Sequence, residues 1–339
     1  VHVFNRSELI EVATFRSGEI SSNDGELVKD QSGKIIRDNI WGNLDQDTYR
    51  RDFTVNALYY CPKTKKIIGH KDGMRDIHKK IIVSIGDPRQ RFSEDPVRSL
   101  RAIRFSNKLK FKIDTKIKDA IYEKGHLLSS ISNARIFDEF CKMFLSGMAE
   151  KNFNKLNSFG LSKFLITTEP EQNEFTRKLI TESLRNTDKR LTNNQSVTPG
   201  FLLAALLWPQ LIEKCSMKGD INLRKFFRSM DPILRSQQRI TAIPRKFHSY
   251  IKDIWVLQLK LHSRIGKQPY KTLKHPRFRA AYDFMLIREK SSGETKSLGK
   301  WWTDFQKNDE NLKKSLISSL KEKSQHESFK TFGFSQELR

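Results

Sequence analysis

The stretch Glu94-Asp-Pro-Val-Arg-Ser-Leu-Arg-Ala-Ile-Arg-Phe105 marks the change from short strands to long helices in this sequence. Asp95 stands directly before Pro96, and proline is tolerated at the first helical position because its missing N–H would have no partner there. We therefore predict a helix with Asp95 as its N-cap, and the pattern stays helical from there on. Short β-branched and apolar runs before it predict strands, which makes the fold class α+β.

Two pairs of short strands are expected in the first part of the chain. The runs 1–4 and 9–15 flank turn-prone residues and predict a hairpin, and a second pair is expected near 55–60 and 66–69. Between the pairs, the stretch 17–33 is rich in Ser, Asp and Gly and predicts a loop.

The rest of the chain predicts helices. Apolar residues recur at three- and four-residue steps from Ile251 to Leu261, as in an amphipathic helix, and the run Phe201–Trp208 is apolar enough to be buried. The tail after about Lys307 has few large apolar residues, and this composition predicts weak order.

Composition narrows the class of protein. A chain of 339 residues exceeds the usual single domain, and 37% hydrophobic with 30% charged residues is a globular balance. No apolar run approaches the roughly 18 to 20 residues that span a bilayer, so we expect no transmembrane segment. The three scattered cysteines show no metal-ligand spacing and favour a reducing, cytoplasmic compartment.

The net charge of +24 favours a polyanionic partner, and its distribution is uneven. Residues 1–50 hold 6 Lys and Arg against 9 Asp and Glu, whereas residues 235–290 hold 14 against 3. The second segment also contains aromatic residues, so it could follow a phosphate backbone and stack on bases. A solvated basic helical face with aromatic residues in the core explains the segment equally well.

Three clusters of polar residues could carry chemistry, and the first contains Glu11. Glu11 alternates with Ile10 and Val12, so it points to the opposite face of a strand. A carboxylate on a rigid strand is a good Mg²⁺ ligand, and phosphoryl transfer uses such ions. Taken alone, the position favours the plainer alternative, a solvent-facing glutamate.

The second cluster is Arg50, Arg51 and Asp52, with Asn56 four residues further on. Paired guanidinium groups suit phosphate oxygens, while a carboxylate and an amide can bind ribose hydroxyls. The cluster therefore suits a nucleoside triphosphate, although a surface salt bridge is the alternative for Arg-Arg-Asp alone.

The third cluster contains Glu94 and Asp95, which precede Arg98 by four and three residues and so share its helix face; Arg101 and Arg104 follow. Donors and acceptors in fixed directions could read a base edge without a template. The alternative is an N-cap with ion pairs worth about 0.3 to 0.5 kcal/mol each.

The order of the clusters along the chain and their exact sequences change their interpretation. Ile10–Arg16, Arg50–Tyr60 and Glu94–Phe105 together resemble successive motifs of the class II tRNA nucleotidyltransferase and poly(A) polymerase family. Further stretches resemble the C-terminal part of the poly(A) polymerase branch and extend the match to about residue 306: Ala242–Lys246, Asp253–Leu259, His275–Asp283 and Lys300–Trp302.

The resemblance implies a nucleotidyltransferase head of the DNA polymerase β type over 1–85, a helical neck over 86–150, a helical body with a basic RNA-binding region over 151–306, and a tail over 307–339. The family begins with a Gly-Gly motif and an Asp-x-Asp pair of metal ligands, which no position here matches. The chain also opens with Val1 instead of Met, so we expect an incomplete head: a fragment, an incomplete gene model or a decayed gene.

The resemblance also assigns roles, carried over position by position. Glu11 would be catalytic and bind Mg²⁺, Arg16 and the loop after it would lie near the triphosphate, and the other matched residues would hold triphosphate and ribose (Arg50, Arg51, Asp52 and Asn56) or recognise the base (Glu94, Asp95 and Arg98). We expect all of them to line one cleft.

The implied activity is template-free addition of AMP from ATP to RNA 3′ ends by two-metal nucleotidyl transfer, linked to RNA processing and decay. RNA 3′ ends, ATP and RNA-decay machinery would be the partners. One alternative is CCA addition to tRNA, and another is a catalytically inactive RNA-binding fragment. Because the Asp pair is unmatched, we expect this chain by itself not to extend RNA.

Overall fold

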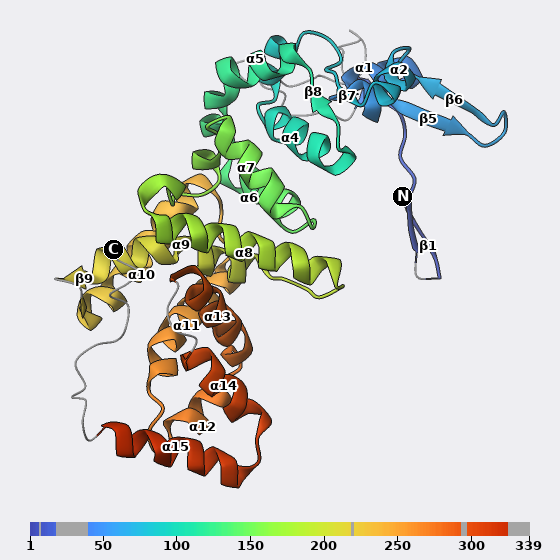
Figure 1. Ribbon diagram of the computed structural model, residues 1–339. Helices are drawn as coiled ribbons and strands as arrows, with labels where there is room; N and C mark the ends of the chain where they lie inside the picture. The colour runs from blue at the N-terminus through green and yellow to red at the C-terminus, as the bar shows by residue number, and fades with distance from the viewer. Residues whose placement is uncertain (7, 18–39, 218–219, 293–296, 325–339) are drawn as a thin grey trace. The chain divides into compact units, whose positions relative to one another are not determined.

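The computed structural model describes residues 1–6, 8–17, 40–217, 220–292 and 297–324 (Figure 1). The chain divides into two compact units, Val1–Ile131 and Ser132–Arg339. The loop expected over 17–33 lies outside the described residues except for Ser17. The boundary between the units falls inside the stretch 86–150 that the resemblance implies is the neck, and the four-part division of the chain stays a prediction.

Short strands and helices alternate in the first unit (Figure 1). Antiparallel pairs join β1 to β2, β3 to β4 and β5 to β6, and a parallel pair joins β7 to β8, so both predicted hairpins are confirmed. The strands are β1 (His2–Asn5), β2 (Glu8–Glu11), β3 (Arg16–Ser17), β4 (Ile40–Trp41), β5 (Leu58–Cys61), β6 (Lys66–Gly69), β7 (Ile81–Ile82) and β8 (Lys112–Ile113). The helices are α1 (Leu44–Arg50), η1 (Thr54–Asn56), α2 (Gly73–His78), α3 (Pro88–Glu94), α4 (Val97–Leu109), α5 (Thr115–Lys124) and η2 (Gly125–Ser130).

The start of α4 differs by one residue from the prediction. Pro96 occupies the N-cap position with helical φ and ψ, and Asp95 instead ends α3. The Asp95 carboxylate still caps α4, because it accepts the N–H of Val97 at 3.3 Å. Glu94 is the last residue of α3, so it does not share a helix with Arg98 as predicted; the extended backbone of Asp95 interrupts the helix between them.

The second unit is almost entirely helical (Figure 1). The predicted burial of Phe201–Trp208 and of the Ile251 to Leu261 stripe is confirmed. Its elements are α6 (Asn133–Phe144), α7 (Ala149–Ser158), η3 (Ser162–Phe164), η4 (Pro170–Gln172), α8 (Glu174–Thr192), α9 (Pro199–Cys215), β9 (Ser216–Met217), β10 (Asp220–Ile221), α10 (Leu223–Ile240), α11 (Arg245–His262), α12 (Gln268–Leu273), α13 (Phe278–Ser292), α14 (Ser297–Lys307) and α15 (Glu310–Ser324).

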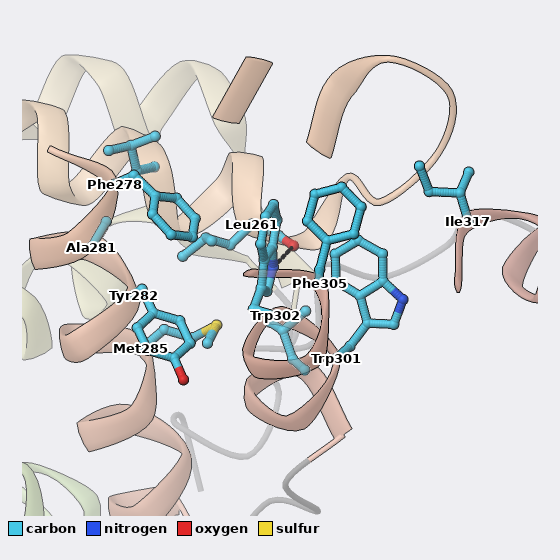
Figure 2. Packing of buried hydrophobic residues seen from close by; sticks show 11 residues of the cluster. Leu261, Phe278, Ala281, Tyr282, Met285, Trp301, Trp302, Phe305 and Ile317 are labelled. Atoms are coloured by element: carbon cyan, nitrogen blue, oxygen red, sulfur yellow. Dashed lines mark hydrogen bonds between the residues drawn. The ribbon is translucent and has the colours of Figure 1, made fainter. Parts of the chain in front are cut away.

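Aromatic side chains from α13 and α14 form the core of the C-terminal part of this unit (Figure 2). Trp302 is fully buried and donates its indole N–H to the Leu261 carbonyl at 2.9 Å, and the Phe305 ring packs edge-to-face against it with the ring centres 5.7 Å apart. Ile317 of α15 belongs to the same cluster. Residues 310–324 are therefore a packed helix, and the prediction of a weakly ordered tail is wrong for this part of it.

Within the described ranges, no helix combines the length and the apolarity needed to cross a membrane. Cys61, Cys141 and Cys215 are all free thiols.

Candidate active site

Helix α1 supplies the first part of the candidate site. Its start is fixed by a reciprocal cap, in which the Asn43 side chain accepts the N–H of Gln46 and the Gln46 side chain accepts the N–H of Asn43. The helix then places Asp47 one turn before Arg50 and Arg51, the spacing at which side chains share a face. The local sequence thus places a carboxylate next to the arginine pair.

Asp47 is the hub of this group, with only 3% of its side chain exposed. Its Oδ1 accepts from Arg50 Nε at 3.1 Å and from the backbone N–H of Arg16 at 3.3 Å. Its Oδ2 accepts from Arg51 Nε at 3.1 Å and Nη2 at 2.8 Å, and from the Tyr59 hydroxyl at 2.5 Å. One buried carboxylate therefore sets the direction of two guanidinium groups that are 25% and 42% exposed.

The charge of Asp47 is stabilised by these contacts. Burial alone would disfavour the carboxylate, but hydrogen bonds from Tyr59 and Arg51 outweigh it and lower the pKa of Asp47 from 3.8 to about 2. Asp47 is therefore ionised at neutral pH and remains an acceptor for both arginines.

Asp52 connects this segment to α4. Its Oδ1 accepts from Arg98 Nε and its Oδ2 from Arg101 Nη1, both at 2.9 Å. Burial opposes the charge of Asp52, but the guanidinium groups of Arg101 and Arg98 outweigh it and hold its pKa below the ordinary value. The second and third sequence clusters therefore form one network.

Helix α3 closes the network from the other side. Arg91 donates through Nη2 to the carbonyls of Arg50 and Arg51 at 2.8 and 3.0 Å, and its Nη1 lies 3.1 Å from the Glu94 carboxylate. Arg98 Nη1 also reaches Glu94, at 3.2 Å. The backbone of the arginine pair is thus tied to the same helices that carry the predicted base-recognition residues.

The predicted site residues fall into three groups by placement. Arg16, Arg50 and Arg51 meet at Asp47, while Asp52, Glu94 and Arg98 form the second network. Asp95 caps α4, and Asn56 ends η1 with a half-buried side chain.

Glu11 is not brought to these groups by any contact that joins described residues. It ends β2 with 75% of its side chain exposed, and its carboxylate lies 4.0 Å from the imidazole of His2. All eight residues of β1 and β2 are exposed, since a two-stranded hairpin has no facing layer to bury either side. The prediction that Glu11 lines a cleft with the other clusters is not supported by this placement.

The described residues do not fit a two-metal site. Within the described ranges, no group of three or more His, Cys, Asp or Glu side chains could hold a metal ion. Mg²⁺ prefers octahedral oxygen coordination, and a single exposed glutamate supplies one ligand position.

Three residues of the site were not predicted as such: Asp47, Tyr59 and Arg91. The signal for Asp47 was present in its spacing from Arg50 and Arg51, the same spacing that selected Glu94 and Asp95. Arg91 could not be found in this way, because its partners lie about 40 positions earlier in the chain.

Protein-family models match three parts of the chain. Residues 1–83 match the poly A polymerase head domain, and residues 110–176 match a probable RNA- and SrmB-binding site of polymerase A. Residues 219–331 match the arginine-rich C-terminus of polymerase A.

Solved structures with a similar fold include a CCA-adding enzyme in its apo form II, with a TM-score of 0.57 and 19% identity, covering 97% of this chain and 76% of that chain. A tRNA-processing enzyme with CTP has a TM-score of 0.55 and 20% identity, covering 83% and 75%. At this identity the likeness concerns the fold.

Relatives that match nearly the whole of this chain agree with the family models. Poly(A) polymerase I of Haemophilus influenzae is 36% identical over 328 residues, which cover 93% of this chain and 72% of the relative. Poly(A) polymerase I of Escherichia coli O157:H7 is 36% identical over 337 residues, covering 95% and 72%. With matched motifs, a matched head and this extent of similarity, the chain belongs to the poly(A) polymerase I family.

Proposed function

We propose that this protein is a polynucleotide adenylyltransferase that adds AMP from ATP to RNA 3′ ends without a template. The observation that carries the proposal is the hydrogen bond that Arg98 Nε donates to the Asp52 carboxylate at 2.9 Å, because it joins the motif proposed for the triphosphate to helix α4, proposed for base recognition. The relatives named poly(A) polymerase I support it by matching 93% to 95% of the chain.

CCA addition is less well supported. A CCA-adding enzyme of Pediococcus pentosaceus is 37% identical, but the match covers only 47% of this chain. The basic C-terminal part of the chain instead matches the polymerase A arginine-rich C-terminus. The match to the CCA-adding enzyme thus leaves about half of the chain uncovered, and the C-terminal part favours polyadenylation.

The arginine pair binds the triphosphate in this proposal. Guanidinium groups bind phosphate oxygens through two parallel hydrogen bonds, provided that they are held in one direction. Asp47 supplies that restraint for Arg50 and Arg51, and the backbone of Arg16 is tied to the same carboxylate. The triphosphate therefore binds to guanidinium donors whose directions are already fixed, which lowers the entropic cost of binding.

The network around Asp52 and α4 recognises the nucleoside. Arg98 is 8% exposed and is held by both Asp52 and Glu94, so its remaining donor capacity has a fixed direction. Asp95 caps the same helix, and Asn56 follows four residues after Asp52. Fixed donors and acceptors on α4 can select adenine where a template strand would otherwise do so.

Replacing Asn56 with alanine tests the ribose contact. We expect the preference for ATP over 2′-deoxyATP to fall about 5- to 10-fold, because one hydrogen bond contributes about 1 to 1.5 kcal/mol. Competition binding with the two nucleotides measures this preference. The affinity for 2′-deoxyATP should stay unchanged and serves as the internal control; equal weakening of both nucleotides would show that Asn56 supports the fold instead.

Nucleotide selectivity tests the proposed function itself. The chain is offered ATP or CTP, first in a binding assay and then with an RNA that has a free 3′-hydroxyl. We expect ATP to bind more tightly than CTP, and any transfer to add AMP without a fixed stop. Preference for CTP with termination after three additions would reject polyadenylation in favour of CCA addition.

Glu11 and Mg²⁺ enter this proposal through the family resemblance. Nucleotidyl transfer in the family uses a divalent metal with ATP, and Glu11 is the one carboxylate here that matches a metal ligand. RNA decay machinery as a partner and a cytoplasmic location belong to the same proposal, with three free thiols as the supporting observation for a reducing compartment.

A further inference from the structure

A basic groove runs over one side of the second unit, between α8 and α13. It consists of two adjoining pockets of about 250 and 360 Å³, which share Arg190, Arg279 and Asp283 as lining residues. The two pockets therefore adjoin at these three residues, which are paired with one another. We call the two pockets together the α8–α13 groove.

The groove carries an excess of positive charge. Its lining holds two carboxylates, Glu182 and Asp283, against six cationic side chains: Arg185, Lys189, Arg190, Arg277, Arg279 and Lys290. The excess of four positive charges attracts a polyanion.

Most of the six cations are held in place by the two carboxylates. Asp283 pairs with Arg190 at 3.0 Å and with Arg279 at 3.1 Å. Glu182 pairs with Arg185 at 3.2 Å and with Lys290 at 2.5 Å. Arg185 also pairs with Glu150, which lies outside the lining, at 2.8 Å. With this third carboxylate counted, an excess of three positive charges remains around the groove.

One end of the groove has a stacking element. The Arg277 guanidinium lies 4.7 Å from the centre of the Tyr250 ring, and both residues line the first pocket. The Tyr250 ring also packs closely on Gly200, because a side-chain carbon added there would lie 3.0 Å from the ring. Tyr250 therefore supports a planar cation at the rim, and Arg277 has no carboxylate partner among the described residues.

We infer that the α8–α13 groove binds single-stranded RNA, with phosphates along the cations and one base stacked on the Arg277 plane. Arginine planes and aromatic rings bind unstacked bases, and these faces are hidden in a duplex. The choice of RNA rests on the proposed function, but the groove lies wholly within the second unit and uses none of the residues assigned to nucleotide binding.

Charge and stacking are tested by different variants. Lys189→Gln removes one phosphate contact, so the slope of log affinity against log salt should fall by about 0.7. Arg277→Lys keeps the charge and loses the plane, so the slope should stay while affinity falls about 5-fold or more. Tyr250→Ala should behave like Arg277→Lys, and Tyr250→Phe should bind like the wild type.

Fluorescence anisotropy with a labelled single-stranded oligoadenylate measures these effects on the whole chain without ATP. Lys225→Gln on α10 is the charge-matched control, because Lys225 is also exposed and lies outside the groove. Equal losses in Lys225→Gln and Lys189→Gln would overturn the inference in favour of a general charge effect. Circular dichroism establishes that each variant is folded.

Two further probes decide what kind of polyanion the groove takes. A duplex RNA of the same length should bind equally well to the wild type and to Arg277→Lys, since it offers no free base. Polyglutamate should compete only weakly and without dependence on Arg277. If Arg277→Lys weakened the binding of polyglutamate as much as that of oligoadenylate, the groove would be assigned to acidic protein segments. Failure of ATP selectivity with intact groove binding would reject the proposed function and leave this inference standing.

Discussion

Replacing Asp47 with asparagine is expected to weaken ATP binding by about 10- to 100-fold, the effect of losing one or two charge-assisted hydrogen bonds at a binding site. The asparagine keeps the shape of the side chain but loses the charge that accepts from Arg50, Arg51 and Tyr59. Both guanidinium groups are partly exposed, so without this partner they are free to take other directions. Titration calorimetry of the chain with ATP measures the loss.

The sign of the change decides between two roles for Asp47. A carboxylate next to a triphosphate also repels it, so removing the charge would strengthen ATP binding if neutralisation were its main effect. Weaker binding means that orientation of the arginines dominates. Asp45→Asn is the matched control, because it removes the same charge from the same helix, but Asp45 is exposed and lies more than a turn before the arginine pair.

The pH dependence of stability gives a second measurement for Asp47. A carboxylate whose pKa is lowered on folding contributes stability that is fully present above its unfolded pKa and is lost as the pH falls through its folded pKa. For Asp47 that window runs from 3.8 down to about 2. The difference in unfolding free energy between wild type and Asp47→Asn should therefore be constant above this window and shrink within it. A difference that persists at the lower limit would contradict the role of the ionised carboxylate.

Asp47 also shows where sequence analysis succeeded and where it stopped. The Arg50 to Asn56 cluster is predicted because its residues lie close together in the sequence. The cluster from Glu94 to Arg98 is predicted from helical spacing, although Glu94 ends α3 and reaches Arg98 across the start of α4. The same spacing applied to α1 selects Asp47, so that residue was within reach. Arg91 was not, since its bonds to the carbonyls of Arg50 and Arg51 depend on how α3 packs.

For Glu11, the sequence predicts the strand but not the surface that the strand faces. Alternation of Ile10, Glu11 and Val12 predicted a strand, and the hairpin β1–β2 confirms it. Which surface that strand faces depends on contacts distant in sequence, and local pattern carries no such information. The resemblance supplied a place for Glu11 beside the nucleotide, whereas the described residues leave it exposed.

The tail shows a different kind of failure. Its composition is rich in Lys and Ser, and such a segment was expected to bury too little apolar surface to be ordered. Helix α15 is ordered because a few apolar residues share one face: Ile317 joins the aromatic cluster, and Leu316 and Leu320 pack against it. The partner for this face comes from α14, so composition of the tail alone could not reveal it.

Replacing Trp302 with alanine is expected to destabilise the second unit by about 3 to 5 kcal/mol, the range for removing a fully buried large aromatic side chain. Trp302 lies among Phe278, Trp301 and Phe305 with none of its surface exposed (Figure 2). The substitution also leaves the Leu261 carbonyl without its indole donor. Urea unfolding followed by circular dichroism measures the loss, and hydrogen exchange of α13 and α14 amides assigns it to this unit.

Two matched variants distinguish packing from a general effect of substitution. Trp302→Phe keeps an aromatic ring but loses the hydrogen bond to Leu261, so it should cost less than alanine and still more than about 1 kcal/mol. Leu312→Ala on α15 removes a side chain that is 52% exposed and should change stability by no more than about 0.5 kcal/mol. Because α15 packs on the same cluster, exchange protection of Ile317 should fall with Trp302→Ala as well. If Trp302→Ala cost no more than Leu312→Ala, the aromatic cluster would not be what holds α14 and α15 to the rest of the unit.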